Sequence, residues 1–160
     1  MRDSRIVILL TATITPNTFD TLVLSNPEER RSQYLNALHF YLQNTNYPLV
    51  FVENSGESIK DYFKDYEDRI EFLSFTSIPS TVDKGKGLKE MEIINFAIIH
   101  SERIRHAKVI VKITGRLKVL NIKRITVDFL KTHHSLKLVS GNILKFRTPY
   151  PQGLSDKKIA

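Results

Sequence analysis

The fold is decided by the stretch Lys108-Val109-Ile110-Val111-Lys112-Ile113-Thr114-Gly115-Arg116. Its apolar first part predicts a buried strand, which runs directly into a polar cluster closed by glycine and arginine. Because side chains alternate between the two faces of a strand, Lys112 and Thr114 point the same way, and Arg116 joins them if the strand persists. Open α/β sheets bind ligands at the carboxyl ends of their strands. Two cations and a hydroxyl at that place suit a small molecule that carries phosphate.

The order of the expected strands and helices predicts the fold class. Strands are expected at residues 6–10, 49–53, 70–75, 109–114 and 136–139. The first, second and fourth of these are almost continuously apolar, as strands covered on both faces should be. Helical patterns lie between them, at residues 26–42, 59–66, 88–101 and 122–131. The alternation predicts an α/β fold with a mostly parallel sheet and helices on both faces.

Two of the helices carry specific expectations. The first should begin with Asn26 or Ser25 as its cap and Pro27 at the first helical position, where proline is tolerated. The third, at 88–101, should bury a stripe at helical spacing. Its expected members are Met91, Ile94 and Ile98, flanked by Ile93 and Ala97.

Size and charge bound the class of protein. With 160 residues, of which 41% are hydrophobic, the chain fits a single α/β domain over 1–160. It has no cysteine, which excludes disulfides and suits a cytoplasmic protein. Residues 1–100 hold 10 Lys/Arg and 14 Asp/Glu, whereas residues 101–160 hold 14 Lys/Arg and 3 Asp/Glu. The second half therefore predicts an anionic partner, which could be a nucleotide, a nucleic acid or a membrane surface.

Two polar segments have both a ligand-binding and a structural interpretation. Glu53-Asn54-Ser55-Gly56 closes the second strand and could hydrogen-bond a ribose or a base, or form an ordinary turn. Lys84-Gly85-Lys86-Gly87, with Glu90 soon after, leads into the third helix. Glycines and a helix start admit a phosphate, while a solvated basic loop is the alternative. Arg30 and Arg31 lie early in the first helix. One of them could reach the same site, and the alternative is a solvated helix face.

Other chemistries have no signal in the sequence. There is no Walker motif, no Gly-x-Ser-x-Gly elbow and no histidine at metal-ligand spacing from a carboxylate. Aromatic residues do not interleave with basic ones, which argues against nucleic acid as the partner. For Lys112, Thr114 and Arg116 the ligand interpretation is favoured, because a charge at the end of a buried strand needs a partner.

Taken in order, these segments resemble bacterial glycosyltransferases of the GT-A type, nucleotide-sugar transferases that build surface polysaccharides. The resemblance covers residues 5–121. It rests on Leu10-Thr11-Ala12-Thr13-Ile14, on Arg30 or Arg31 with Gln33-Tyr34 and Ala37-Leu38, on Val52-Glu53-Asn54-Ser55-Gly56, on Gly85-Lys86-Gly87 with Glu90, and on Lys112-Ile113-Thr114-Gly115-Arg116. It implies that Thr11 and residues 53–55 lie near the nucleoside. The candidate substrate-binding residues are Thr11, Arg30, Glu53, Asn54, Ser55, Lys84, Lys86, Glu90, Lys112, Thr114 and Arg116, with Lys84, Lys86, Lys112 and Arg116 expected near the diphosphate.

The resemblance implies transfer of a sugar from a nucleotide-diphosphate donor to a glycan or lipid-linked acceptor. The protein would be cytoplasmic or peripheral at the inner face of an anionic membrane, with 122–160 as a basic C-terminal segment. Such enzymes usually carry Asp-x-Asp for a divalent metal, but Lys112-x-Thr114-Gly115-Arg116 stands in its place here. No metal-binding residue is assigned, and a divalent metal cofactor stays open. Only about forty residues follow Asn121, which leaves a truncated transferase open, and no catalytic residue is assigned. The alternative is a non-enzymatic basic module that binds nucleic acid or an anionic membrane surface.

Overall fold

Strands and helices alternate along the chain in the order expected. The structure, a computed structural model, describes residues 6–16, 26–77, 86–132 and 137–139. The elements are β1 (Ile6–Ala12), α1 (Pro27–Asn44), β2 (Leu49–Glu53), the 3-10 helix η1 (Lys60–Tyr66), β3 (Ile70–Ser74), α2 (Lys86–His100), α3 (Glu102–Arg105), β4 (Val109–Thr114), α4 (Ile122–Thr132) and β5 (Lys137–Val139). The predicted bounds of β2 and β4 are confirmed at both ends.

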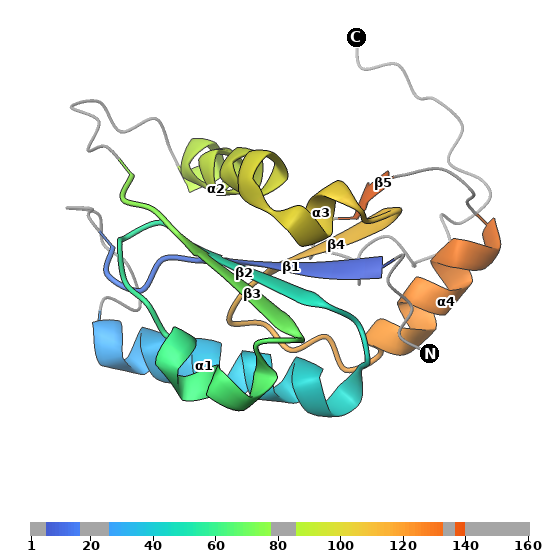
Figure 1. Cartoon of the computed structure of the whole chain (residues 1–160), viewed down its shortest axis with the longest axis horizontal. Helices are drawn as coiled ribbons and strands as arrows, with labels where there is room; N and C mark the ends of the chain where they lie inside the picture. Colours follow the sequence, from blue (N-terminus) through green and yellow to red (C-terminus); the bar gives the residue numbers. More distant parts are fainter. Residues whose placement is uncertain (1–5, 17–25, 78–85, 133–136, 140–160) are drawn as a thin grey trace, which may run out of the picture.

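The sheet is parallel, and its strand order reverses at β1. Four strands lie in the order β3-β2-β1-β4, and the short β5 extends the sheet beyond β4. The chain therefore moves outward from β1 to β3 and then crosses back to β4 on the other side of β1 (Figure 1). This Rossmann-like order places a topological switch point between β1 and β4.

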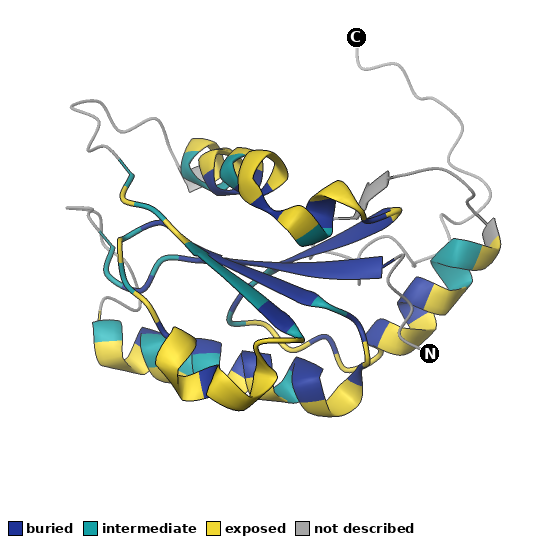
Figure 2. Ribbon diagram, viewed as in Figure 1, coloured by how far each residue is buried: buried dark blue, intermediate teal, exposed yellow. Residues whose placement is uncertain are grey.

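Helices cover both faces of the sheet, as predicted. Figure 1 shows α1 below the sheet and α2 with α3 above it. Alternate side chains of β1 enter the two layers: Ile8 and Leu10 pack in the core shared with α1, η1 and α4, while Val7 and Leu9 pack with α2 and α3. Strands β1, β2 and β4 are consequently buried along most of their length, whereas β3 at the edge of the sheet is mostly half-buried (Figure 2).

Helix α1 begins where the sequence predicts. Asn26 is its cap, and the side-chain oxygen Oδ1 accepts hydrogen bonds from the backbone amides of Glu28 at 2.9 Å and Glu29 at 3.4 Å. Pro27 occupies the first turn, where its missing amide hydrogen costs nothing. The buried face of the helix carries Arg30, Tyr34, Ala37, Leu38, Tyr41 and Leu42.

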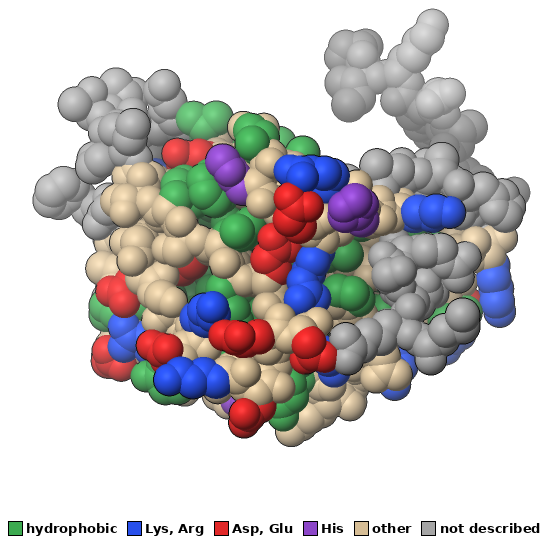
Figure 3. Space-filling view, in the orientation of Figure 1, with side chains coloured by type: hydrophobic (Ala, Val, Ile, Leu, Met, Phe, Trp, Pro, Cys, Tyr) green, Lys and Arg blue, Asp and Glu red, His purple; other side chains and the backbone are tan. Residues whose placement is uncertain are grey.

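The expected stripe of α2 is partly wrong. Ile93, Ile94 and Ala97 are buried against the sheet, but Met91 and Ile98, expected beside them, are 55% and 50% exposed. Other exposed hydrophobic side chains of α2 are Leu88 and Ile99. Hydrophobic atoms accordingly gather over α2 at the top of the face drawn in Figure 3. Because α2 is apolar on two sides, helical spacing alone did not distinguish the side that meets the sheet.

The short helix expected at 59–66 forms as the 3-10 helix η1. Its backbone departs from helical angles at Phe63, whose fully buried side chain joins the α1 side of the core. Among the described residues, no helix is both long and apolar enough to cross a membrane.

The loop between β4 and α4 is fastened to α1 by one buried hydroxyl. The Tyr41 hydroxyl donates to the carbonyl oxygen of Leu117 at 2.8 Å and accepts from the backbone amide of Val119 at 3.0 Å. Burial raises the pKa of Tyr41 to about 12. Removing the hydroxyl would leave both backbone groups without this partner.

Tyr41→Phe should lower the free energy of unfolding by about 2 kcal/mol near neutral pH, because two buried backbone groups lose their partner. The folded pKa of Tyr41, about 12, lies above the unfolded value of about 10. The wild-type protein therefore has this hydroxyl's contribution in full below about pH 10 and loses it as the pH rises toward 12. Urea unfolding of both proteins between about pH 7 and 11.5 should show their difference narrowing. A difference that stays constant across this range would contradict the assignment.

Candidate functional site

The polar residues predicted at strand ends do meet at one edge of the sheet. In the strand pairing, Ala12 at the end of β1 lies opposite Glu53 at the end of β2, and Thr11 lies opposite Thr114 at the end of β4. This carboxyl edge is at the left of Figure 1, where the chain leaves β1 and where α1 and α2 begin. It includes the topological switch point between β1 and β4, the position at which such sheets bind ligands.

On the α2 side of this edge, a buried lysine is paired with a carboxylate. The Lys112 ammonium lies 2.5 Å from Oε1 of Glu90, and the lysine side chain is only 8% exposed. The same Glu90 oxygen accepts a hydrogen bond from the Thr11 hydroxyl at 2.7 Å. The partner that a desolvated Lys112 requires is therefore Glu90, one of the residues predicted for the site.

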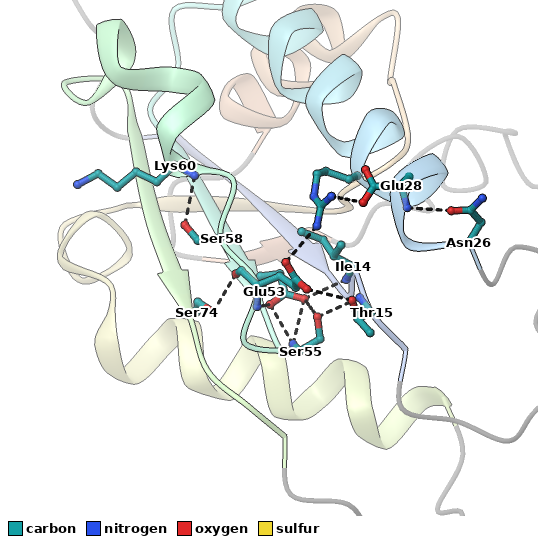
Figure 4. A network of polar contacts seen from close by, with 11 residues as sticks. Ile14, Thr15, Asn26, Glu28, Glu53, Ser55, Ser58, Lys60 and Ser74 are labelled. Atoms are coloured by element: carbon teal, nitrogen blue, oxygen red, sulfur yellow. Dashed lines mark hydrogen bonds and ion pairs between the residues drawn. The ribbon is translucent and has the colours of Figure 1, made fainter.

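At the end of β2, the Glu53 carboxylate is buried and accepts hydrogen bonds from other groups of the chain. It accepts hydrogen bonds from the backbone amides of Ile14, Ser55 and Glu57, each at 2.9 Å, and from the Ser55 hydroxyl. These donors come from the loop after β1 and the loop after β2 (Figure 4). Glu53 thus holds two loops of the carboxyl edge in place.

Asn54 and Ser55 also join these two loops. Oδ1 of Asn54 accepts from the Thr13 hydroxyl at 2.6 Å. The Ser55 hydroxyl accepts from the Thr15 amide at 3.0 Å, as Figure 4 shows. The turn continues through Gly56, whose φ of +80° is a left-handed conformation that glycine adopts without strain. Residues 53–56 therefore form a turn, as the structural interpretation expected. This turn lies at the carboxyl edge of the sheet, where the ligand-binding interpretation also expected these residues.

Arg30 does not lie on a solvated helix face. Its side chain is buried, and Nε donates to the carbonyl oxygen of Thr13 at 2.7 Å. This hydrogen bond connects α1 to the loop after β1. The Tyr34 hydroxyl assists by accepting from the Thr13 amide at 3.0 Å. Arg31 lies between Glu28 and Glu57, and its hydrogen bond to Glu28 raises the pKa of its guanidinium further.

The β4 strand ends at Thr114, so the condition under which Arg116 would face the same way as Lys112 is not met. Gly115 instead turns the chain against β1, and its amide donates to the Thr11 carbonyl at 2.8 Å. Nη1 of Arg116 donates to Oε1 of Gln33 on α1 at 3.2 Å, while its Nε is buried without a hydrogen-bond partner in the described part of the chain. Lys112 therefore contacts α2, and Arg116 contacts α1.

The other two cations expected near the diphosphate are Lys84 and Lys86. Lys84 lies outside the described residues, as does the side chain of Lys86. Whether all four cations converge stays a prediction. Thr114 is half-buried beside Thr11, in the position expected for it.

The residues at the end of β4 do not fit a divalent metal. The buried charged side chain there is the Lys112 ammonium, which would repel a divalent cation and takes up one oxygen of the nearby Glu90. In the described ranges, no three His, Cys, Asp or Glu side chains gather in a way that could hold a metal ion.

Comparison with known proteins defines no family: no family model, no curated protein and no solved structure matches the chain. The fold and the polar edge define the class, which is a small α/β domain with a parallel, Rossmann-like sheet.

For two side chains at this edge, those of Tyr34 and Gln33, the sequence predicted no role in the site. Tyr34 falls in the apolar stripe of α1, yet its hydroxyl serves the β1 loop, and Gln33 next to it binds Arg116. One signal was available: Tyr34 follows Arg30 by four residues, so the two side chains share one face of the helix.

Gly115→Ala should destabilise the fold by roughly 1–3 kcal/mol, because overpacking forces the backbone to move. A Cβ at this position would lie 2.7 Å from the Thr11 carbonyl oxygen and 3.1 Å from the ring of Tyr34. Gly87→Ala is the matched control, since nothing lies within 4 Å of its Cβ and α2 gains an alanine. Urea unfolding should show a loss for the first variant and none for the second; equal stability of both would contradict the close approach.

Glu53→Gln should cost about 2–3 kcal/mol of unfolding free energy, because an amide nitrogen replaces one acceptor among buried donors. Amide hydrogen exchange at Ile14 and Glu57 should also accelerate, since both amides donate to this carboxylate. Asp61→Asn is the control, with a side chain that is 92% exposed. Unchanged exchange at both amides would show that the loops do not depend on Glu53.

Proposed function

We propose that this chain is the nucleotide-sugar-binding domain of a glycosyltransferase that transfers a sugar from a nucleotide-diphosphate donor to a glycan or lipid-linked acceptor. The proposal places the donor at the carboxyl edge of the sheet, over the switch point between β1 and β4. The observation that supports it best is the reversal of strand order at β1, together with the charged residues that β4 brings to that point.

In this proposal Arg116 contacts the diphosphate. Its only hydrogen bond to a described residue goes to the neutral amide oxygen of Gln33, and Nε has no such partner. A buried guanidinium nitrogen without a partner is costly. The Arg116 side chain as a whole is half-buried, so a shift of its guanidinium toward a bound phosphate would replace the unsatisfied Nε by charge-assisted hydrogen bonds. Because Lys112 is already paired with Glu90, Arg116 is the described cation of this edge that is better suited to take an anion.

The two loops fastened by Glu53 would carry the nucleoside. Their hydrogen bonds preorganise the edge, so binding would require little ordering of these loops. The proposal uses no divalent metal, since the residues at the end of β4 do not fit one. A cation aimed at the diphosphate would neutralise the leaving group instead.

Binding of uridine, guanosine, thymidine and adenosine diphosphate sugars at millimolar concentration, followed by calorimetry, tests the proposal directly. One of these donors should bind selectively, and Arg116→Ala should weaken it by about tenfold or more, because a charge-assisted hydrogen bond is lost. Lys118→Ala, an exposed cation two residues away, should change the affinity less than about twofold.

A full panel without binding would overturn the proposal. Affinity for unrelated polyanions that collapses at moderate salt would instead favour the basic binding module, because such binding depends on counterion release. Equal donor affinity of Arg116→Ala and wild type would remove the diphosphate role of Arg116.

A further inference from the structure

Among the described residues, the cluster formed by Thr11, Glu90 and Lys112 uses only one of the two carboxylate oxygens of Glu90. The contacts of Glu90 with Thr11 and Lys112 both use Oε1: the Thr11 hydroxyl lies at 2.7 Å and the Lys112 ammonium at 2.5 Å. None of the described residues donates a hydrogen bond to Oε2. The Glu90 side chain is 36% exposed, while that of Lys112 is 8% exposed. Solvent therefore reaches the carboxylate of this cluster but hardly reaches the lysine.

The charge of this cluster argues against phosphate as its ligand. Lys112 carries one positive charge and Glu90 one negative charge, so the pair offers an incoming anion no net attraction. A phosphate that reached the pair would meet the exposed carboxylate first, and like charges repel. Displacing Glu90 would leave its carboxylate without the partner that Lys112 now provides.

The same cluster suits a hydroxyl group. An ionised carboxylate only accepts hydrogen bonds, and a sugar hydroxyl can donate one to it. Such a bond is charge-assisted and therefore stronger than one between neutral groups. Lys112 and Thr11 both contact Oε1, which holds the carboxylate in one orientation and leaves Oε2 to the ligand.

We infer that Glu90 binds a hydroxyl of the ligand's sugar through Oε2, and that Lys112 and Thr11 are positioning residues that hold Glu90 in place. The inference rests on the proposed function and deepens it: Arg116 contacts phosphate on the α1 side of the edge, and Glu90 selects for hydroxyls on the α2 side. It also replaces the expectation that Lys112 contacts the diphosphate. The hydroxyl belongs either to the ribose or to the transferred sugar.

The test measures the affinity of four ligands by calorimetry: the selected nucleotide sugar, its nucleoside diphosphate, and the 2′-deoxy and 3′-deoxy forms of that diphosphate. For the wild type, removing the recognised hydroxyl should weaken binding by about tenfold or more. For Glu90→Gln, the complete ligand should be weakened by a similar factor, and removing that hydroxyl should then cost little more. This non-additivity identifies the pair of groups in contact.

The ligand that loses affinity identifies the source of the hydroxyl. A loss confined to one deoxy form indicates the ribose. An affinity of Glu90→Gln that falls for the nucleotide sugar but not for the diphosphate indicates the transferred sugar. Glu92→Gln, a more exposed carboxylate on the same helix, is the matched control and should bind all four ligands as the wild type does.

A second variant protects the test against misfolding. Glu90→Gln leaves Lys112 buried without a counter-charge, so the paired variant Glu90→Gln with Lys112→Met removes both charges together. It should fold and show the same insensitivity to the recognised hydroxyl. Inorganic pyrophosphate should bind either variant no more weakly than the wild type, whereas Arg116→Ala should weaken it.

The outcomes separate this inference from the proposed function. If a nucleotide binds but the Glu90 variants keep full discrimination between hydroxylated and deoxy ligands, the role of Glu90 is overturned and the proposed function stands. Weaker pyrophosphate binding by the Glu90 variants would likewise overturn it, because Glu90 would then serve the phosphates. If none of the nucleotides binds the wild type, the proposed function fails and this inference fails with it.

Discussion

Strand β1 is covered on both faces and hydrogen-bonded along both edges, and the organisation of the molecule follows from that constraint. All seven of its residues are buried. Water therefore cannot satisfy polar groups where the strand ends, and the protein must supply their partners. The Thr11 hydroxyl donates to Glu90 of α2, and the Ile14 amide in the loop after β1 donates to Glu53 of β2. The amide of Gly115, just after β4, donates to the carbonyl oxygen of Thr11. The fold therefore requires these polar contacts, whether or not a ligand binds at this edge.

Glu53 and Lys112 are both buried at this edge, and their charges are stabilised in different ways. Glu53 is surrounded by backbone amides, which cannot move without unfolding the loops they belong to. Lys112 instead depends on one side chain, that of Glu90. Glu90 belongs to α2, the helix that follows the long connection after β3. Glu53 is therefore part of the rigid frame, whereas the pair at Lys112 has a partly exposed member that a ligand can reach. This difference separates the residues that build the edge from those we propose to act there.

Much of the fold could be predicted from the sequence because its signals are local. Continuous apolar runs locate β2 and β4, and the pair Asn26 and Pro27 locates the start of α1. The site was harder, because its contacts join residues that are distant in the chain. The alternation that relates Lys112 to Thr114 stops where the strand stops, so it did not apply to Arg116. The burial of Arg30 depends on the path of the loop after β1, to which no local pattern points.

Helix α2 shows what its polar contacts decide. Apolar residues lie on both its inner and its outer side, so the hydrophobic pattern alone fits more than one rotation of the helix about its axis. Three contacts distinguish these settings: Glu90 with Lys112, Glu92 with Ser77 at 3.0 Å, and Phe96 stacked on Phe75 with ring centroids 4.3 Å apart. The ion pair is therefore one of the contacts that fix which side of α2 faces the sheet.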